Sequence, residues 1–440
     1  MNIAPSQFQR IASKPISQLN QINHFYSLRK SQWLTRSQLQ KLQEKKLRNI
    51  IKHCYKHVKY YNQLFKSLNL HPADIKNIED LNKIPILTKS KIQNSPEKLI
   101  SNNLLLKDCY FTRTSGSTGI PLKIIIDENT HTCIGSRQLR YYSACGVKPR
   151  DTISTFSAPH HFNKSKSWIN LLGFFKKQNY SVFDPIDNHI KQLLLRNPDV
   201  IQAYPSILSL IAQRIEETLI HKINPRLIIT TSESMSQALR KKINSAFQSE
   251  IFDQYGSTEF GTFAWECSEH NGYHIDIEDC IVEFLNNGEA VSPGENGEIV
   301  VTSLSNYAMP LIRYSLGDIG TPSNEKCSCG RGLPLIKKIN GRIDDFLTLP
   351  SGQLLSPRNL GTLEYIEGIA KFRIIQEYKD KIIVQVVKGA YFCAKTVKQI
   401  QSNILQGCLG ENLQIIVETV EDIPRDKSGK QRMILSKVTK

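Results

Sequence analysis

Between about residue 110 and residue 260, short apolar segments alternate with longer helical ones, and this alternation limits the fold most strongly. The segments between the short runs, such as 206–220 and 236–247, have helical periodicity. Strands that alternate with helices form a largely parallel sheet that is covered by helices. We therefore expect an α/β fold with a large N-terminal domain of mixed or parallel sheets flanked by helices. The expected strands are 124–126, 152–156, 200–203, 227–230 and 251–254.

The pattern changes twice nearer the C-terminus. Residues 280–304 carry Gly- and Pro-marked turns between β-type runs, which is typical of an antiparallel hairpin or a small β subdomain. After residues 340–346 the sequence predicts short strands and two helices, enough for a small mobile α+β domain, and 440 residues allow two or three domains. The expected divisions are a basic N-terminal extension at 1–36, a large domain at 37–340, a hinge at 341–345 and a C-terminal lid domain at 346–440.

Charge and hydropathy limit the classes of binding partner that we expect. The net charge is +17, but Lys and Arg are spread along the chain without a basic recognition helix, so we do not expect nucleic-acid binding. No apolar run approaches the roughly 18 residues of a membrane helix. Residues 1–43 contain no Asp or Glu, which is also typical of a transit peptide, but we interpret them as a basic surface extension. The expected location is the cytoplasm.

Cysteine usage predicts a metal site. Ten cysteines without an export signal indicate a reducing compartment, where metal ligands or buried thiols are more common than disulfides. Cys267 and His270 form a Cys-x-x-His pair, and Cys327 and Cys329 form a Cys-x-Cys pair. Four such ligands suit a structural, tetrahedral Zn²⁺, with His274 as the reserve ligand, and free thiols are the alternative.

A loop rich in hydroxyl groups and glycine, "TRTSGSTGIPLKI", spans residues 112–124. Its spacing excludes a Walker A loop, a dinucleotide-binding glycine motif and a hydrolase nucleophile elbow. Its backbone N–H groups and hydroxyls, followed by Lys123, suit a polyphosphate. A plain Ser/Gly linker is the alternative.

Five motifs in sequence order resemble those of the acyl-adenylate-forming enzymes. They are this loop, "DQYGSTEFG" (253–261), "RYSLGDIG" (313–320), "GRIDDFL" (341–347) and "IPRDKSGKQR" (423–432). The stretches "KLRNIIKHCYKHVKYYNQLF", "AMPLIRYSLGD" and "CSCGRGLP" further resemble the phenylacetate–CoA ligase-like branch, which includes proteins associated with capsule biosynthesis. The resemblance covers the chain from residue 37 onward.

The resemblance implies a reaction and its partners. A carboxylic acid and ATP form an acyl-adenylate with release of pyrophosphate, and the acyl group then passes to CoA. Transfer to an amine, a hydroxyl or a carrier-protein thiol is the first alternative. A non-catalytic nucleotide-binding scaffold is the second, and the presence of Glu259, Asp318 and Lys430 argues against it. A homodimer is left open.

The resemblance also implies roles for single residues. Lys430 contacts the carboxylate and the α-phosphate, Thr258 approaches the α-phosphate, and Glu259 holds Mg²⁺. Asp344 is the hinge, and Asp318 accepts the ribose hydroxyls. Ser315 and Leu316 replace a more usual Arg-Thr pair, which removes a positive charge near the nucleotide. The remaining nucleotide-binding residues are Thr114, Ser115, Gly116, Ser117, Thr118, Gly119, Lys123, Glu233, Tyr255, Gly256 and Arg342, and the weaker candidates for the acid are His160 and His161.

Overall fold

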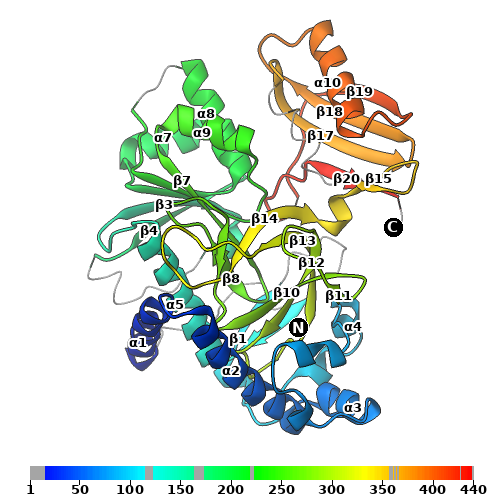
Figure 1. Ribbon diagram of the computed structural model, residues 1–440. Coiled ribbons are helices and arrows are strands. Elements are labelled where there is room, and N and C mark those ends of the chain that lie inside the picture. Colours follow the sequence, from blue (N-terminus) through cyan, green and yellow to red (C-terminus); the bar gives the residue numbers. More distant parts are fainter. Residues whose placement is uncertain are drawn as a thin grey trace.

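The computed structural model comprises a large domain and a smaller C-terminal domain (Figure 1). The structure describes residues 15–113, 122–162, 173–218, 222–355, 360, 363, 366–426 and 428–438. Among these residues, no helix combines the length and the apolar character that a membrane span requires.

One mixed sheet of twelve strands organises the large domain, in the order β11-β10-β12-β13-β14-β9-β8-β7-β6-β5-β3-β4. The last five strands in this order run parallel to one another. They are β7 (Glu250–Ser257), β6 (Leu227–Thr230), β5 (Val200–Ala203), β3 (Thr152–Ser157) and β4 (Lys176–Ser181). The helices that accompany this parallel half are α5 (Glu128–Ala144), α7 (Ile186–Arg196), α8 (Pro205–Thr218) and α9 (Gln237–Phe247).

The other half of the sheet is antiparallel and begins where β7 pairs with β8. The predicted hairpin at 280–304 corresponds to β10 and β12, which pair directly. Together the two halves confirm the predicted α/β fold class. The antiparallel strands are β8 (Gly261–Trp265), β9 (Tyr273–Ile275), β10 (Cys280–Asn286), β11 (Glu289–Ala290), β12 (Gly297–Ser303), β13 (Tyr314–Ser323) and β14 (Leu335–Arg342).

The N-terminal part covers one end of this sheet. A capping box on Thr35, in which Gln38 bonds back to the Thr35 backbone, starts the long helix α2. The predicted strand at 124–126 pairs antiparallel with β1 and stays outside the large sheet. The elements here are α1 (Pro15–Ser31), α2 (Arg36–His57), α3 (Lys59–Ser67), α4 (Lys89–Asn94), β1 (Tyr110–Arg113) and β2 (Lys123–Ile126).

Helix α1 is packed into the large domain, whereas we expected residues 1–36 to be a surface extension. The Ser31 hydroxyl donates to Glu278 Oε1 at 2.6 Å, and the Ser136 hydroxyl of α5 donates to the carbonyl of Gln21 at 2.8 Å. His24 Nε2 lies 3.1 Å from Asp279 Oδ2. Polar contacts therefore hold much of this helix, and an apolar stripe in the sequence does not mark it.

The C-terminal domain has its own core on a four-stranded sheet of order β19-β18-β17-β20. The chain enters it from β14 through the single 3₁₀ turn η6 (Ile343–Asp345), within the predicted hinge. In Figure 1 this domain, coloured orange to red, stands beyond the end of β14. Its elements are β15 (Leu347–Thr348), β16 (Leu354–Leu355), β17 (Ile369–Tyr378), β18 (Lys381–Lys388), α10 (Ala394–Gly407), β19 (Gln414–Val420) and β20 (Ile434–Ser436).

Candidate active site

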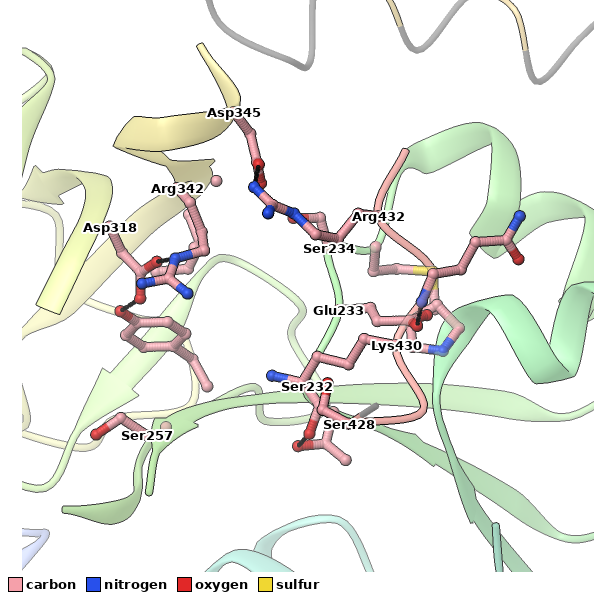
Figure 2. A pocket seen from close by; sticks show the side chains of 18 of the residues that line it. Ser232, Glu233, Ser234, Ser257, Asp318, Arg342, Asp345, Ser428, Lys430 and Arg432 are labelled. Carbon is pink, nitrogen blue, oxygen red and sulfur yellow. Dashed lines mark hydrogen bonds and ion pairs between the residues drawn. The ribbon is translucent and has the colours of Figure 1, made fainter. Parts of the chain in front are cut away.

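A cavity of about 1320 Å³ is lined by residues of both domains. Figure 2 shows Asp318 and Arg342 on one side of it and Lys430 on the other. Thr114, Ser115, Gly116, Ser117, Thr118 and Gly119 lie outside the described residues. The cavity gathers most of the other predicted site residues, namely His160, His161, Glu233, Tyr255, Gly256, Thr258, Glu259, Asp318, Arg342 and Lys430.

Tyr255, Asp318 and Arg342 lie together on β7, β13 and β14, joined by one hydrogen bond and one ion pair. The Tyr255 hydroxyl donates to Asp318 Oδ2 at 2.7 Å, and Arg342 Nε lies 3.6 Å from Asp318 Oδ1. Asp318 and Arg342 are cross-strand partners of β13 and β14, so the sheet register fixes their approach. Burial raises the pKa of Asp318, and the Arg342 charge opposes that shift. The group thus presents an oriented carboxylate to the cavity.

Glu259 is held by a residue to which the sequence analysis gave no role. The Tyr314 hydroxyl donates to Glu259 Oε1 at 3.0 Å, and burial raises the pKa of Tyr314. Tyr314 is the aromatic residue of the motif "RYSLGDIG", which was the available signal. One oxygen of the Glu259 carboxylate is therefore fixed in place by a neutral donor.

The loop that carries Lys430 is built to enter the cavity. Asp426 Oδ1 accepts hydrogen bonds from the backbone N–H groups of Ser428 at 2.8 Å and Lys430 at 3.0 Å. Gly429 has φ +79°, and a Cβ there would lie 2.5 Å from Val182 Cγ2 of the large domain. Glycine therefore allows the loop to approach the large domain closely.

The two predicted histidines lie near Lys430 in the same cavity. Their ring centroids are 4.2 Å apart. Burial lowers the pKa of His161 to about 4, and the neighbouring charges of His160 and Lys430 add to that shift. His161 is therefore neutral at pH 7, so its imidazole can make hydrogen bonds there without supplying a positive charge.

Lys123, which we predicted to lie beside the phosphates, is not among the described residues that line the cavity. Its Nζ lies 4.0 Å from the ring centroid of Phe111. Strand β2 begins at Lys123, in register with Arg113 of β1, and the pairing directs the side chain to this exposed face. The ammonium group therefore packs on an aromatic ring.

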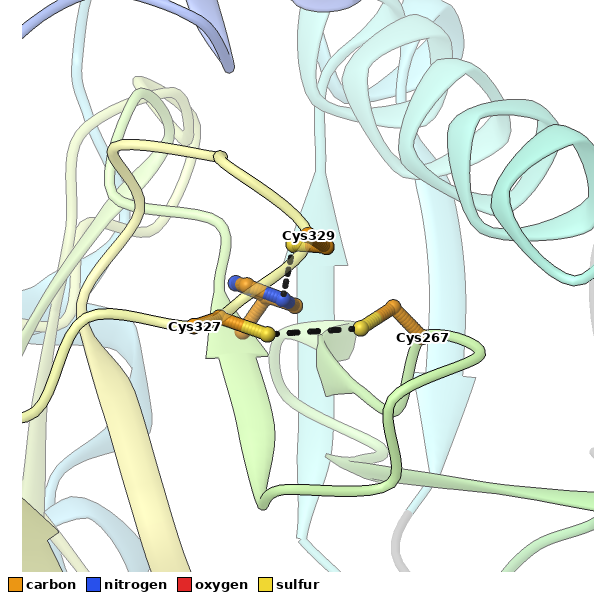
Figure 3. Close-up of side chains that lie close together, drawn as sticks. Cys267, Cys327 and Cys329 are labelled. Atoms are coloured by element: carbon orange, nitrogen blue, oxygen red, sulfur yellow. Dashed lines mark hydrogen bonds between the residues drawn. The ribbon is translucent and has the colours of Figure 1, made fainter.

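A second cluster, on the antiparallel half of the sheet, contains the three predicted cysteine ligands and the reserve ligand His274 (Figure 3). The ligand atoms of Cys267, His274, Cys327 and Cys329 all lie within 4.8 Å of one another. Cys267 Sγ is 3.6 Å from Cys327 Sγ, and Cys329 Sγ is 3.4 Å from His274 Nε2. Zn–S bonds of about 2.3 Å in a tetrahedron place two sulfurs about 3.8 Å apart, so the residues fit zinc.

The predicted fourth ligand, His270, is wrong, and the reserve ligand His274 takes its place. The backbone N–H of His270 closes a turn onto the Cys267 carbonyl at 3.0 Å, and His270 has φ +48°. Its ring then faces acidic residues, with Nδ1 3.4 Å from Glu266 and Nε2 3.3 Å from Glu250. Two carboxylates therefore occupy the nitrogens of His270.

Comparisons with known proteins agree with this architecture. Residues 347–437 match the family described as the CapK C-terminal domain. The chain is 24% identical to phenylacetate-coenzyme A ligase of Thermus thermophilus, over 91% of this chain and 97% of that protein. It is also 24% identical to protein CapK of Staphylococcus aureus, over 90% of this chain and 89% of that protein.

Solved structures show the same fold. 2-Hydroxyisobutyryl-CoA ligase in its postadenylation state, in complex with R3-HIB-AMP, aligns with a TM-score of 0.78 at 17% identity, over 92% of this chain and 91% of that chain. In its thioesterification state, with 2-HIB-AMP and CoA, it aligns at 0.64 and 17% identity, over 92% of each chain. The predicted resemblance is confirmed: this chain has the adenylate-forming ligase fold and is a relative of the phenylacetate–CoA ligases and CapK.

Proposed function

We propose that this protein activates a carboxylic acid with ATP to an acyl-adenylate, releases pyrophosphate and transfers the acyl group to CoA. The observation that carries this proposal is the meeting, in one cavity, of Lys430 from the small domain with the Tyr255–Asp318–Arg342 group of the large domain. The names of the relatives support the reaction class, since phenylacetate-coenzyme A ligase is among them.

The first step joins two anions, which explains the need for Lys430. An oxygen of the carboxylate attacks the α-phosphorus of ATP, and the bond from that phosphorus to the pyrophosphate oxygen breaks. Negative charge builds up around phosphorus, and a positioned ammonium group stabilises it. Thr258 lines the same cavity and donates its hydroxyl to an α-phosphate oxygen in this proposal. Thr114–Gly119 bind the β- and γ-phosphates.

Asp318 binds the ribose in this proposal. A carboxylate can accept hydrogen bonds from two neighbouring hydroxyl groups, and Tyr255 together with Arg342 sets its direction. The Tyr255 ring and Gly256 lie beside the adenine. In this proposal, residues on the strands β7, β13 and β14 orient the nucleotide, and the C-terminal domain supplies the cation.

The proposal includes two metals with different tasks. Glu259, oriented by Tyr314, would hold Mg²⁺, whose charge neutralises phosphate oxygens. Cys267, His274, Cys327 and Cys329 would hold a structural Zn²⁺ that ties the turn after β8 to the segment before β14.

Acid-dependent exchange of labelled pyrophosphate into ATP tests the function. A panel of aryl, aliphatic and amino acids is assayed singly, and the CoA thioester is then sought by mass spectrometry. We expect exchange with one class of acid and none without acid. Exchange followed by acyl transfer to an amine or a carrier thiol, with no CoA thioester formed, means that this group and not CoA is the acceptor. Absence of ATP binding contradicts adenylation.

Replacing Asp318 by asparagine is expected to weaken ATP binding roughly 10- to 100-fold, because hydrogen bonds to a charged acceptor contribute about 1.5–3 kcal/mol. Isothermal titration calorimetry with ATP and with inorganic pyrophosphate measures the effect. Pyrophosphate affinity should stay unchanged, since it lacks the ribose. Asp187→Asn, with a carboxylate side chain 72% exposed on the large domain, is the matched control. An equal loss for both ligands contradicts the ribose assignment.

A further inference from the structure

Glu233 lies where the Lys430 loop meets the large domain, and both oxygens of its carboxylate accept hydrogen bonds from the protein. Oε1 accepts hydrogen bonds from the backbone N–H of Gln431 at 2.8 Å and from the Ser206 hydroxyl at 2.9 Å. Oε2 accepts one from the backbone N–H of Ser206 at 2.9 Å. The side chain is only 9% exposed. The donor from Gln431 belongs to the C-terminal domain, so the carboxylate joins the two domains.

Arg425 closes the same contact from the small domain. Its Nη1 donates to Ser206 Oγ at 2.7 Å and to the carbonyl of Gly429 at 3.0 Å, and it lies 3.8 Å from Glu233 Oε1. Its side chain is 11% exposed. Arg425 therefore braces the loop internally while it bonds the helix start of α8. A buried charge pair with this many hydrogen bonds has a defined geometry, because either charge left alone would be costly.

The contact acts directly on the position of Lys430. Gln431 follows Lys430 in the chain, so the bond to Glu233 fixes the loop one residue from the reacting cation. A second ion pair, Arg432 Nη2 to Asp345 Oδ1 at 2.6 Å, joins the same segment to the hinge turn η6. Figure 2 shows Glu233 beside Lys430 and Arg432 beside Asp345. Movement of the C-terminal domain to another orientation requires the hydrogen bond from Gln431 and the ion pair with Arg425 to break.

We propose that Glu233 is a positioning residue for the adenylation step: with Ser206 and Arg425 it holds the C-terminal domain so that Lys430 stays in the cavity. This inference rests on the proposed function. It differs from the sequence-based expectation that Glu233 binds the nucleotide, because the oxygens of Glu233 take donors from the protein. The group contributes to the first half-reaction, and the second proceeds after these bonds have opened.

Glu233→Gln tests the proposal, because the amide has one acceptor oxygen and its NH₂ faces the N–H and O–H donors. The rate of acyl-adenylate formation is measured in single turnover, using the acid that supports exchange. We expect about a tenfold loss of this rate, as for a lost charge-assisted hydrogen bond. The Kd for ATP should change less than about twofold. Transfer from added acyl-adenylate to CoA should keep its wild-type rate.

Three further variants make the result decisive. Arg425→Met should give the same selective loss, and combination with Glu233→Gln should add little, since both remove one network. Glu217→Gln, at the exposed end of α8 with 43% of its side chain exposed, is the matched control and should match wild type.

Three results overturn the positioning role. A weaker Kd for ATP with an unchanged adenylation rate means that Glu233 contacts the nucleotide. Unchanged rates in both Glu233→Gln and Arg425→Met mean that the contact is not used. An equal loss of rate in both half-reactions, together with a lower unfolding temperature, means that the contact only stabilises the fold. Failure of the wild-type protein itself to exchange pyrophosphate contradicts the proposed function instead, so the two failures are distinct.

Discussion

Lys430→Ala is expected to lower acid-dependent ATP–pyrophosphate exchange by about 100-fold or more. Removing one preorganised donor at a developing charge costs about 10²–10³ in rate, and here the lost group is a full cation between two anions. The Kd for ATP should rise only slightly, since Tyr255, Asp318 and Arg342 remain. Steady-state exchange and equilibrium ATP binding are measured on the same preparation.

The matched control for this variant is Lys437→Ala on the same domain, where the lysine side chain is 63% exposed and pairs with Glu377. It should retain wild-type exchange. Transfer of the acyl group from added acyl-adenylate to CoA should also persist in Lys430→Ala, because this step does not form the bond at phosphorus. Exchange retained by Lys430→Ala contradicts the assigned role of the lysine.

Loss of the cysteine-rich cluster is expected to have the largest effect on stability. Cys327→Ser and His274→Asn should reduce zinc from about one ion per chain to near zero, because each removes one of four ligands. We expect the midpoint of thermal unfolding to fall by about 10 °C, which corresponds to several kcal/mol in a domain of this size. Elemental analysis and calorimetry of the purified proteins measure both quantities.

His270→Asn is the matched control for the zinc prediction, since it removes the histidine that the sequence spacing favoured. It should retain zinc, because its ring nitrogens face Glu250 and Glu266. Zinc loss in His270→Asn but not in His274→Asn contradicts the assignment. A wild-type protein without bound metal contradicts the zinc site itself.

The fold was predictable where burial leaves a strong pattern. Strands β5 and β6 are almost entirely apolar because helices cover both faces of a parallel sheet, and the predicted strands 200–203 and 227–230 match them. Strand β4, "KKQNYS", lies at the sheet edge and is polar, so it gave no such signal. Helix α1 escaped prediction for a related reason, since much of its packing depends on hydrogen bonds to distant residues.

The site was predictable where a motif carries its own geometry. Asp318 and Arg342 come from separate motifs, and the register of β13 and β14 brings them together as expected of one nucleotide site. The histidine ligand of the metal site was harder to predict. Cys-x-x-His spacing alone favours one histidine, but the direction of the backbone decides which histidine side chain reaches the cysteines. Strand β9 places His274 opposite Leu335, close to Cys329.

The partners of Glu233 could not be predicted from the sequence either, since Ser206 and Gln431 lie far from it along the chain.

The path of oxygen from the acid tests the central claim most directly. The acid that supports exchange is labelled with ¹⁸O in both carboxylate oxygens and incubated with the protein, ATP and CoA. Attack of the carboxylate on the α-phosphorus, followed by acyl transfer, leaves one ¹⁸O atom in AMP. Mass spectrometry of the nucleotide should therefore show AMP that is heavier by one label. Unlabelled AMP, or label in inorganic phosphate, would contradict an acyl-adenylate intermediate.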